Sequence, residues 1–162
     1  MPGRRDPEPL CDRACTPRDS VDSLIADWRR VRPDLDFAPV GVITRLGRVR
    51  AHVDRELDAV FAAHGVGSAT FAVLVTLARL AAPGGVSQRR LAGELGLTSG
   101  TVSVRIDRLV ADGLVERGHD PDDRRGSLVR PTARGSELLE RLLPAHLDNE
   151  RRLLAALTPA SS

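Results

Sequence analysis

Apolar side chains recur at intervals of three and four residues from residue 20 onward, which is the pattern of amphipathic helices. A first helix is predicted to begin at Ser20 and to end before Pro33, because proline cannot continue a helix. A second, long helix is predicted to open at Pro39 and to close near Gly65 and Gly67. The apolar stripes of these two helices are Val21, Leu24, Ile25, Trp28 and Val31, then Ile43, Leu46, Val49, Val53, Leu57 and Val60.

A third helix is predicted to have Ser68 as its cap and to stop at the Pro-Gly-Gly sequence of residues 83–85. Its inward positions are Phe71, Leu74, Val75, Leu77 and Leu80. Residues 1–19 lack such a pattern, and their proline content and balanced charges predict a disordered tail. The tail holds Cys11 and Cys15, which have no nearby histidine or second cysteine pair, so we interpret them as ordinary thiols and not as a zinc site.

The stretch from Val86 to Pro131 predicts two short helices around a tight turn, followed by a β-hairpin with a charged, glycine-flanked tip. The apolar face of the first helix is Leu91, Ala92 and Leu95, and that of the second is Val102, Ile106, Leu109 and Val110. Gly96 lies where the chain must reverse, and Thr98 or Ser99 can cap the second helix. This layout predicts a helix-turn-helix with a wing, and therefore a mainly α fold with a small β-wing.

The second of these helices has polar side chains away from its apolar face. These are Ser99, Thr101, Ser103, Arg105 and Arg108. Short hydroxyls and guanidinium groups suit base edges and phosphates, so they predict contact with double-stranded DNA. After the hairpin, a last long helix is predicted from Pro131-Thr132, with Pro144 expected to kink it. Its leucines are numerous enough to favour packing against a second subunit, although a core within one chain is equally compatible.

Composition narrows the functional classes. The net charge is +2, so charge alone does not indicate a nucleic-acid partner. We expect a cytoplasmic protein, because no run of 18 apolar residues and no signal peptide precedes the domain. We predict no enzyme, no metal and no cofactor, because the four histidines are scattered and no nucleophile–base pair, P-loop or dinucleotide motif occurs.

Taken together, these residues resemble the MarR family of winged-helix transcriptional regulators. The resemblance rests on Leu-Ala-Gly-Glu-Leu-Gly in the first short helix, the run from Gly100 to Arg117, Asp-Pro-Asp-Asp-Arg-Arg-Gly at the hairpin tip and Arg-Pro-Thr-Ala-Arg-Gly before the last helix. It implies a homodimer with recognition helices in adjacent major grooves and wings in minor grooves. The DNA-binding residues implied are Thr98, Ser99, Thr101, Ser103, Arg105, Arg108, Arg124 and Arg125.

The resemblance also divides the chain into segments. These are a tail (1–19) and a MarR-like domain (20–162) with N-terminal helices (20–67), a winged helix-turn-helix (68–131) and a C-terminal dimerisation helix (132–162).

A finer resemblance is to the urate-responsive subgroup of the family, which binds a small anion through a Trp, an Asp and two Arg. Trp28, Arg105 and Arg117 match the Trp and the two Arg, whereas Ala72 stands where the Asp is expected. The resemblance therefore implies an anionic effector of urate, purine or carboxylate type. Trp28 as core packing and Arg117 as a solvated hairpin residue are the other interpretation.

The sequence thus predicts a homodimeric repressor that leaves a pseudo-palindromic operator when it binds a small anion. The alternative is a winged-helix module that binds protein and not DNA. Such a module needs an exposed apolar patch on the second short helix and the wing, where the sequence instead has hydroxyls and arginines. The residues therefore favour DNA.

Overall fold

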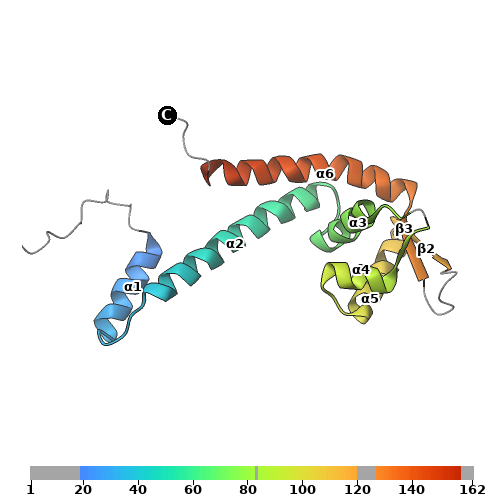
Figure 1. The fold of residues 1–162 in the computed structure, drawn as a ribbon. Coiled ribbons are helices and arrows are strands. Elements are labelled where there is room, and N and C mark those ends of the chain that lie inside the picture. Colours follow the sequence, from blue (N-terminus) through green and yellow to red (C-terminus); the bar gives the residue numbers. More distant parts are fainter. Residues whose placement is uncertain (1–18, 83, 120–126, 158–162) are drawn as a thin grey trace, which may run out of the picture. The chain divides into compact units, whose positions relative to one another are not determined.

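The computed structural model describes residues 19–82, 84–119 and 127–157. The elements are α1 (Ser20–Val31), α2 (Ala38–Ala63), α3 (Ser68–Leu80), β1 (Val86–Ser87), α4 (Gln88–Leu95), α5 (Ser99–Ala111), β2 (Val115–His119), β3 (Ser127–Pro131), α6 (Ala133–Leu154) and a 3-10 turn (Ala155–Leu157). The predicted mainly α fold with a small β-sheet is confirmed (Figure 1). The chain forms two compact units, one up to Ala51 and the other from His52 onward, and α2 runs through the boundary.

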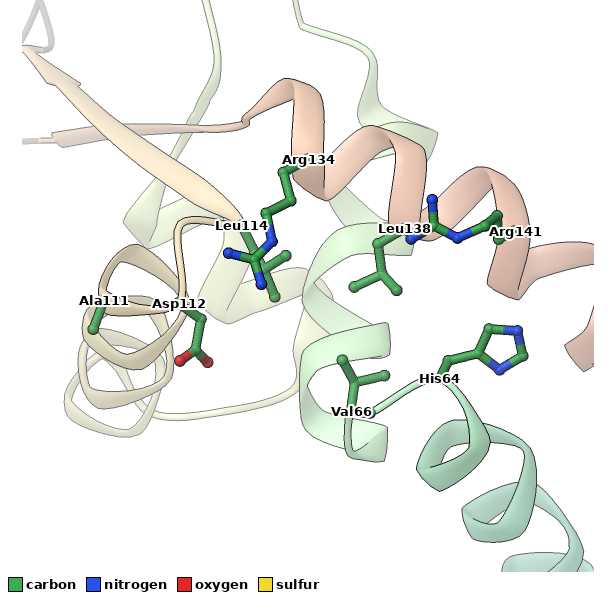
Figure 2. Close-up of a pocket in the computed structure, with 9 residues that line it drawn as sticks. His64, Val66, Ala111, Asp112, Leu114, Arg134, Leu138 and Arg141 are labelled. Carbon is green, nitrogen blue, oxygen red and sulfur yellow. The ribbon is translucent and has the colours of Figure 1, made fainter.

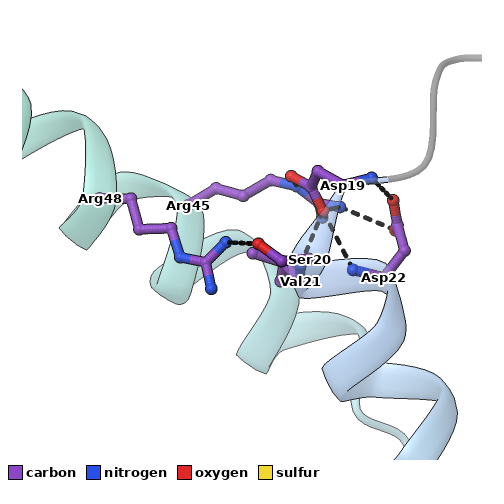
Figure 3. Close-up of polar contacts among 6 residues, drawn as sticks. All are labelled: Asp19, Ser20, Val21, Asp22, Arg45 and Arg48. Carbon is purple, nitrogen blue, oxygen red and sulfur yellow. Dashed lines mark hydrogen bonds and ion pairs between the residues drawn. The ribbon is translucent and has the colours of Figure 1, made fainter.

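In the first unit, ion pairs join α1 to the beginning of α2 (Figure 3). Asp19 is the N-cap of α1, and its carboxylate accepts hydrogen bonds from the backbone N–H groups of Val21 and Asp22. Arg45 donates to both carboxylates, at 2.9 Å from Asp19 Oδ1 and 2.7 Å from Asp22 Oδ1. Arg48 donates to the Ser20 hydroxyl at 2.6 Å. One arginine of α2 thus stabilises the first turn of α1.

This arrangement lowers the pKa of Asp19 to about 2, chiefly because Arg45 hydrogen-bonds to the carboxylate. The ion pair therefore stabilises the helical pair at pH values above 3.8, the ordinary pKa, and its contribution is lost as the pH falls toward 2. We expect NMR titration of the Asp19 carboxyl to show this low midpoint, and the Arg45→Gln variant to move it back toward 3.8. Arg48→Gln is the matched control and leaves it in place. A midpoint near 3.8 in the unmodified chain contradicts the ion pair.

The second unit has one hydrophobic core, to which α3, α4, α5, α6 and the sheet contribute. Its most deeply buried large side chains include Leu74, Leu91, Ile106 and Leu142. The end of α2 joins this core through Phe61, whose ring stacks on that of Phe71 with centroids 5.0 Å apart. The helical core fixes α5 so that one face is buried and the other faces outward.

The sheet is antiparallel with strand order β1-β3-β2. Val86 pairs with Val129, and Val115 pairs with Pro131 at the root of the hairpin. The hairpin strands were predicted, but β1 was not. Two residues are too few to show the alternation of apolar and polar side chains that indicates a strand. Residues 86 and 87 form a strand only because they pair with the edge of β3.

Two local predictions need correction. Ser68 is the first residue of α3 and not its cap, because Gly67 has the extended N-cap conformation and makes no side-chain bond. Val110, predicted on the apolar face of α5, is 40% exposed because it lies at the edge of the stripe formed by Val102, Ile106 and Leu109.

Some leucines of α6 pack in the core of this chain, and others are exposed and free to pack against a second subunit. Those near its beginning lie in the core of the second unit, and these are Leu138, Leu139 and Leu142. Leu147 and Leu154 are exposed by 40% and 57%, and the helix continues through Pro144.

Within the described residues, no single helix is long and apolar enough to cross a membrane, although α2 and α3 meet that criterion jointly as a pair bent by 79°.

Candidate nucleic-acid interface

The turn between α4 and α5 is built by one glycine and one threonine. Gly96 ends α4 in the left-handed conformation (φ 63°), which glycine adopts without the steric cost of a side chain. Thr98 then caps α5, because its hydroxyl oxygen accepts a hydrogen bond from the backbone N–H of Thr101. The Thr98 and Thr101 hydroxyls are themselves hydrogen-bonded at 2.9 Å. The predicted reversal at Gly96 is confirmed, and of the two candidate caps, Thr98 and Ser99, the structure has Thr98.

The outward face of α5 is an exposed stripe of Thr101, Val104 and Arg108, spaced by three and four residues. The guanidinium of Arg108 makes no ion pair with any described residue, so it is available to a phosphate or a base edge. Val104 is 52% exposed and was not predicted as a site residue. Val104 lies off the predicted apolar face of α5, and its place between two polar residues of the stripe signals an external contact, such as a thymine methyl group.

The structure places the other predicted contacts around this stripe. Ser99 is exposed in the first turn of α5, and Ser103 and Arg105 are half-buried on its flank. Arg124 and Arg125 lie outside the described residues, as do Cys11 and Cys15, so their roles remain predictions.

Arg117 lies in β2 and contacts α5 directly. Its guanidinium forms an ion pair with Asp107 at 2.7 Å, and it also donates to the Ser103 backbone carbonyl at 3.5 Å. Arg117 is exposed, and its guanidinium has a carboxylate partner in Asp107. Its role in ligand binding stays a prediction. Asp107 was missed because the pairing depends on β2 lying beside α5, which the spacing along the chain does not reveal.

A second connection joins the end of α5 to the beginning of α6. The Thr132 hydroxyl donates to the Gly113 carbonyl at 2.7 Å, and the Thr132 backbone N–H donates to the Leu114 carbonyl at 3.1 Å. Gly135 lies so close that an added Cβ atom would be 2.0 Å from the Leu114 carbonyl oxygen. The turn that follows α5 is therefore in direct backbone contact with α6.

The α4 helix is tied to α3 by an ion pair between Glu94 and Arg79. Arg79 holds the pKa of Glu94 below its ordinary value by hydrogen-bonding to the carboxylate. The pair is partly exposed, so it orients α4 more than it adds stability. Among the described residues, no three His, Cys, Asp or Glu are grouped closely enough to hold a metal ion.

The remaining predicted ligand residue, Trp28, lies in the first unit. Its ring stacks on that of Phe37, with centroids 5.4 Å apart, and the side chain is 45% exposed. Trp28 is therefore not a core residue of its unit. Ala72 is half-buried in α3.

Comparison with known proteins agrees with this architecture. A model of the MarR family matches residues 64–126. The chain is 36% identical over 135 residues to the HTH-type transcriptional regulator PecS of Dickeya dadantii (strain 3937), which covers 83% of this chain and 81% of PecS.

Solved structures of MarR proteins also match. The chain resembles Sco3205, a MarR family transcriptional regulator from Streptomyces coelicolor in complex with DNA, with a TM-score of 0.70 and 27% identity over 77% of this chain and 79% of that one. It resembles a mutant MarR from E. coli complexed with operator DNA with a TM-score of 0.64 and 27% identity over 82% of this chain and 87% of that one. With its helix-turn-helix, its hairpin wing and this similarity over most of its length, the chain belongs to the MarR family of transcriptional regulators.

Proposed function

We propose that the protein is a DNA-binding transcriptional regulator that reads its operator with α5. The observation that carries the proposal is the exposed stripe of Thr101, Val104 and Arg108 on a helix whose opposite face is anchored in the core. A hydroxyl, a methyl-bearing side chain and a free guanidinium match the donor, acceptor and methyl pattern of the major groove. The DNA complexes of the related Sco3205 and E. coli MarR support the same assignment.

The alternative function, a module that binds only protein, is less well supported by α5. Its exposed large apolar residues are Val104 and Val110, six positions apart. At 3.6 residues per turn they lie about 120° apart around the helix, so they do not form one patch. The groups beside Val104 are polar, which favours DNA over an apolar protein partner.

We infer that the protein acts as a homodimer. On the first part of α2, Val42, Ile43, Leu46 and Val49 are exposed by 58–68%, and their spacing places them along one side of the helix. Monomeric proteins rarely expose an apolar stripe of this kind, whereas a second copy of the chain would bury it. Leu147 and Leu154, exposed on α6, provide further apolar surface for such an interface. A dimer would present two α5 helices to a pseudo-palindromic site about 10 base pairs apart, centre to centre.

We further propose that the protein is a repressor and that a small anion releases it from DNA. The candidate residues are Trp28, Arg105 and Arg117, carried over from the urate-responsive subgroup. The Arg117–Asp107 ion pair sharpens this proposal, because an anion that binds Arg117 must compete with a carboxylate 2.7 Å away. Ala72 offers no carboxylate of its own, so an effector other than urate is compatible with the site.

One experiment tests DNA binding and release together. The full chain is titrated against the DNA that flanks its own gene, with and without urate, xanthine or citrate, and complexes are resolved by gel shift. We expect a specific complex with two chains per site, weakened by an anion that also changes Trp28 fluorescence. A complex no tighter than that with unrelated DNA at the same salt concentration would overturn the DNA-binding proposal. Specific binding that no anion affects overturns only the effector proposal.

A further inference from the structure

The helix proposed to read DNA, α5, has an acidic side chain beside its outward stripe. Asp107 is exposed, and at about 100° per residue it lies about 60° around α5 from Val104. DNA is a polyanion, so a carboxylate at this place repels phosphates and lowers the affinity for DNA in general. The contact that Asp107 makes within the protein indicates what this unfavourable charge contributes.

The partner of Asp107 comes from the neighbouring strand. Arg117 Nη1 of β2 lies 2.7 Å from Asp107 Oδ1, and the same guanidinium donates to the Ser103 backbone carbonyl at 3.5 Å. Ser103 and Asp107 are four residues apart and therefore lie on the same side of α5. One arginine thus contacts two successive turns of α5 and holds β2 along that side.

The backbone of Arg117 is itself fixed by the sheet. Arg117 pairs with Val129 of β3, whose side chain is fully buried in the core, and β3 pairs on its other edge with β1. At the beginning of β3, the Ser127 hydroxyl donates to Gln88 Oε1 of α4 at 3.3 Å. The hairpin strands are therefore joined to both helices of the helix-turn-helix, to α4 through Gln88 and to α5 through Asp107.

We propose that Asp107 is a positioning residue for operator recognition. Its carboxylate holds Arg117, and through it β2, at a fixed place beside the stripe of Thr101, Val104 and Arg108. The hairpin and α5 then meet the operator as one rigid unit, so a duplex that fits only one of them binds weakly. Asp107 thus lowers the affinity for DNA in general and raises the preference for the operator. This inference rests on the proposed DNA-binding function and adds a residue that controls its specificity.

The Asp107→Asn variant separates this role from a simple effect of charge. Fluorescence anisotropy at one fixed salt concentration measures binding of the full chain to the operator duplex from the DNA that flanks its own gene, and to a scrambled duplex of the same length and composition. Removal of a negative charge alone strengthens binding to both duplexes and leaves the ratio of the two affinities unchanged. We expect the affinity for the scrambled duplex to rise about twofold and the operator-to-scrambled ratio to fall about tenfold, the loss caused by one base contact held out of place.

Two further variants make the test specific. Asp112→Asn is the matched control, because it removes the same charge from the residue that follows the last turn of α5 (Figure 2). Asp112 has no ion-pair partner among the described residues, and we expect this variant to keep the ratio of the unmodified chain. Asp107→Glu keeps a carboxylate within reach of Arg117 and is expected to retain most of the preference for the operator. The Asp107–Arg117 pair is partly exposed and adds little to stability, so urea unfolding is expected to show that every variant is folded.

A double variant tests whether the two residues act together. Arg117→Gln is expected to lower the ratio as Asp107→Asn does, and the variant with both changes is expected to lower it no further, because the two changes remove one contact. The inference is overturned if Asp107→Asn keeps the ratio of the unmodified chain, if Asp112→Asn lowers it equally, or if the losses of the two single variants add.

Failure of the proposed function gives a different result. An unmodified chain that binds both duplexes equally rejects operator recognition, and the role of Asp107 with it. An unmodified chain and an Asp107→Asn variant that prefer the operator to the same degree reject only the role of Asp107.

Discussion

Replacing Gly135 with alanine is expected to destabilise the second unit by about 3 kcal/mol. The added Cβ atom would lie 2.0 Å from the Leu114 carbonyl oxygen and 3.0 Å from its carbonyl carbon. These are backbone atoms and cannot rotate away, and the same oxygen accepts a hydrogen bond from Thr132. The first turn of α6 would therefore have to move and break its bonds to Gly113 and Leu114. Urea unfolding followed by circular dichroism measures the loss.

Gly93→Ala is the matched control for this prediction. Gly93 lies inside α4, and a Cβ atom added there has no neighbour within 4 Å. Alanine favours a helix over glycine by about 1 kcal/mol, so this variant is expected to be somewhat more stable than the unmodified chain. A Gly135→Ala variant that unfolds at the same urea concentration as the unmodified chain would show that α6 does not pack this closely on the turn after α5.

Replacing Arg108 with alanine is expected to weaken operator binding by about tenfold to a hundredfold, the range for one good contact to a base edge. Arg108 is exposed in the last turn of α5 and is not engaged by any described carboxylate, so its charge is available to DNA. Arginine and alanine have similar helix propensities, and the change leaves the fold intact. Fluorescence anisotropy with labelled operator, at one fixed salt concentration, measures the effect.

Arg151→Ala provides the control, since it removes the same charge from an exposed position of α6 far along the chain from α5. We expect it to change operator affinity little. If Arg108→Ala and Arg151→Ala have equal effects, the loss comes from overall charge and α5 does not read the operator through Arg108.

Periodicity along the chain predicted most of the second unit, because each of its helices buries one apolar stripe. The turn at Gly96 follows from local chemistry alone, whereas the sequence left both Thr98 and Ser99 as candidates for the cap that the structure assigns to Thr98. Ser68 was misassigned because serine is a stronger capping residue than glycine, and yet the chain enters α3 through Gly67.

Two of the missed features depend on contacts between distant segments. The two residues of β1 form a strand only beside β3, and Asp107 acquires a role only when β2 brings Arg117 to it. Val104 was assigned to no site because only hydroxyl and guanidinium side chains were considered for DNA contact, although Val104 lies off the apolar face of α5 and is exposed.

The ion pair between Arg117 and Asp107 also bears on how salt would affect operator binding. A protein that neutralises DNA phosphates displaces condensed counterions, and each contact adds about 0.9 to the slope of log affinity against log salt. In the proposed complex, Arg117 would contribute little to that slope because it already has a carboxylate partner, whereas the unpaired Arg108 would contribute fully. The number of counterions released at the operator would thus be smaller than the number of arginines near α5. The same ion pair would weaken the general attraction to DNA while it fixes β2 against α5.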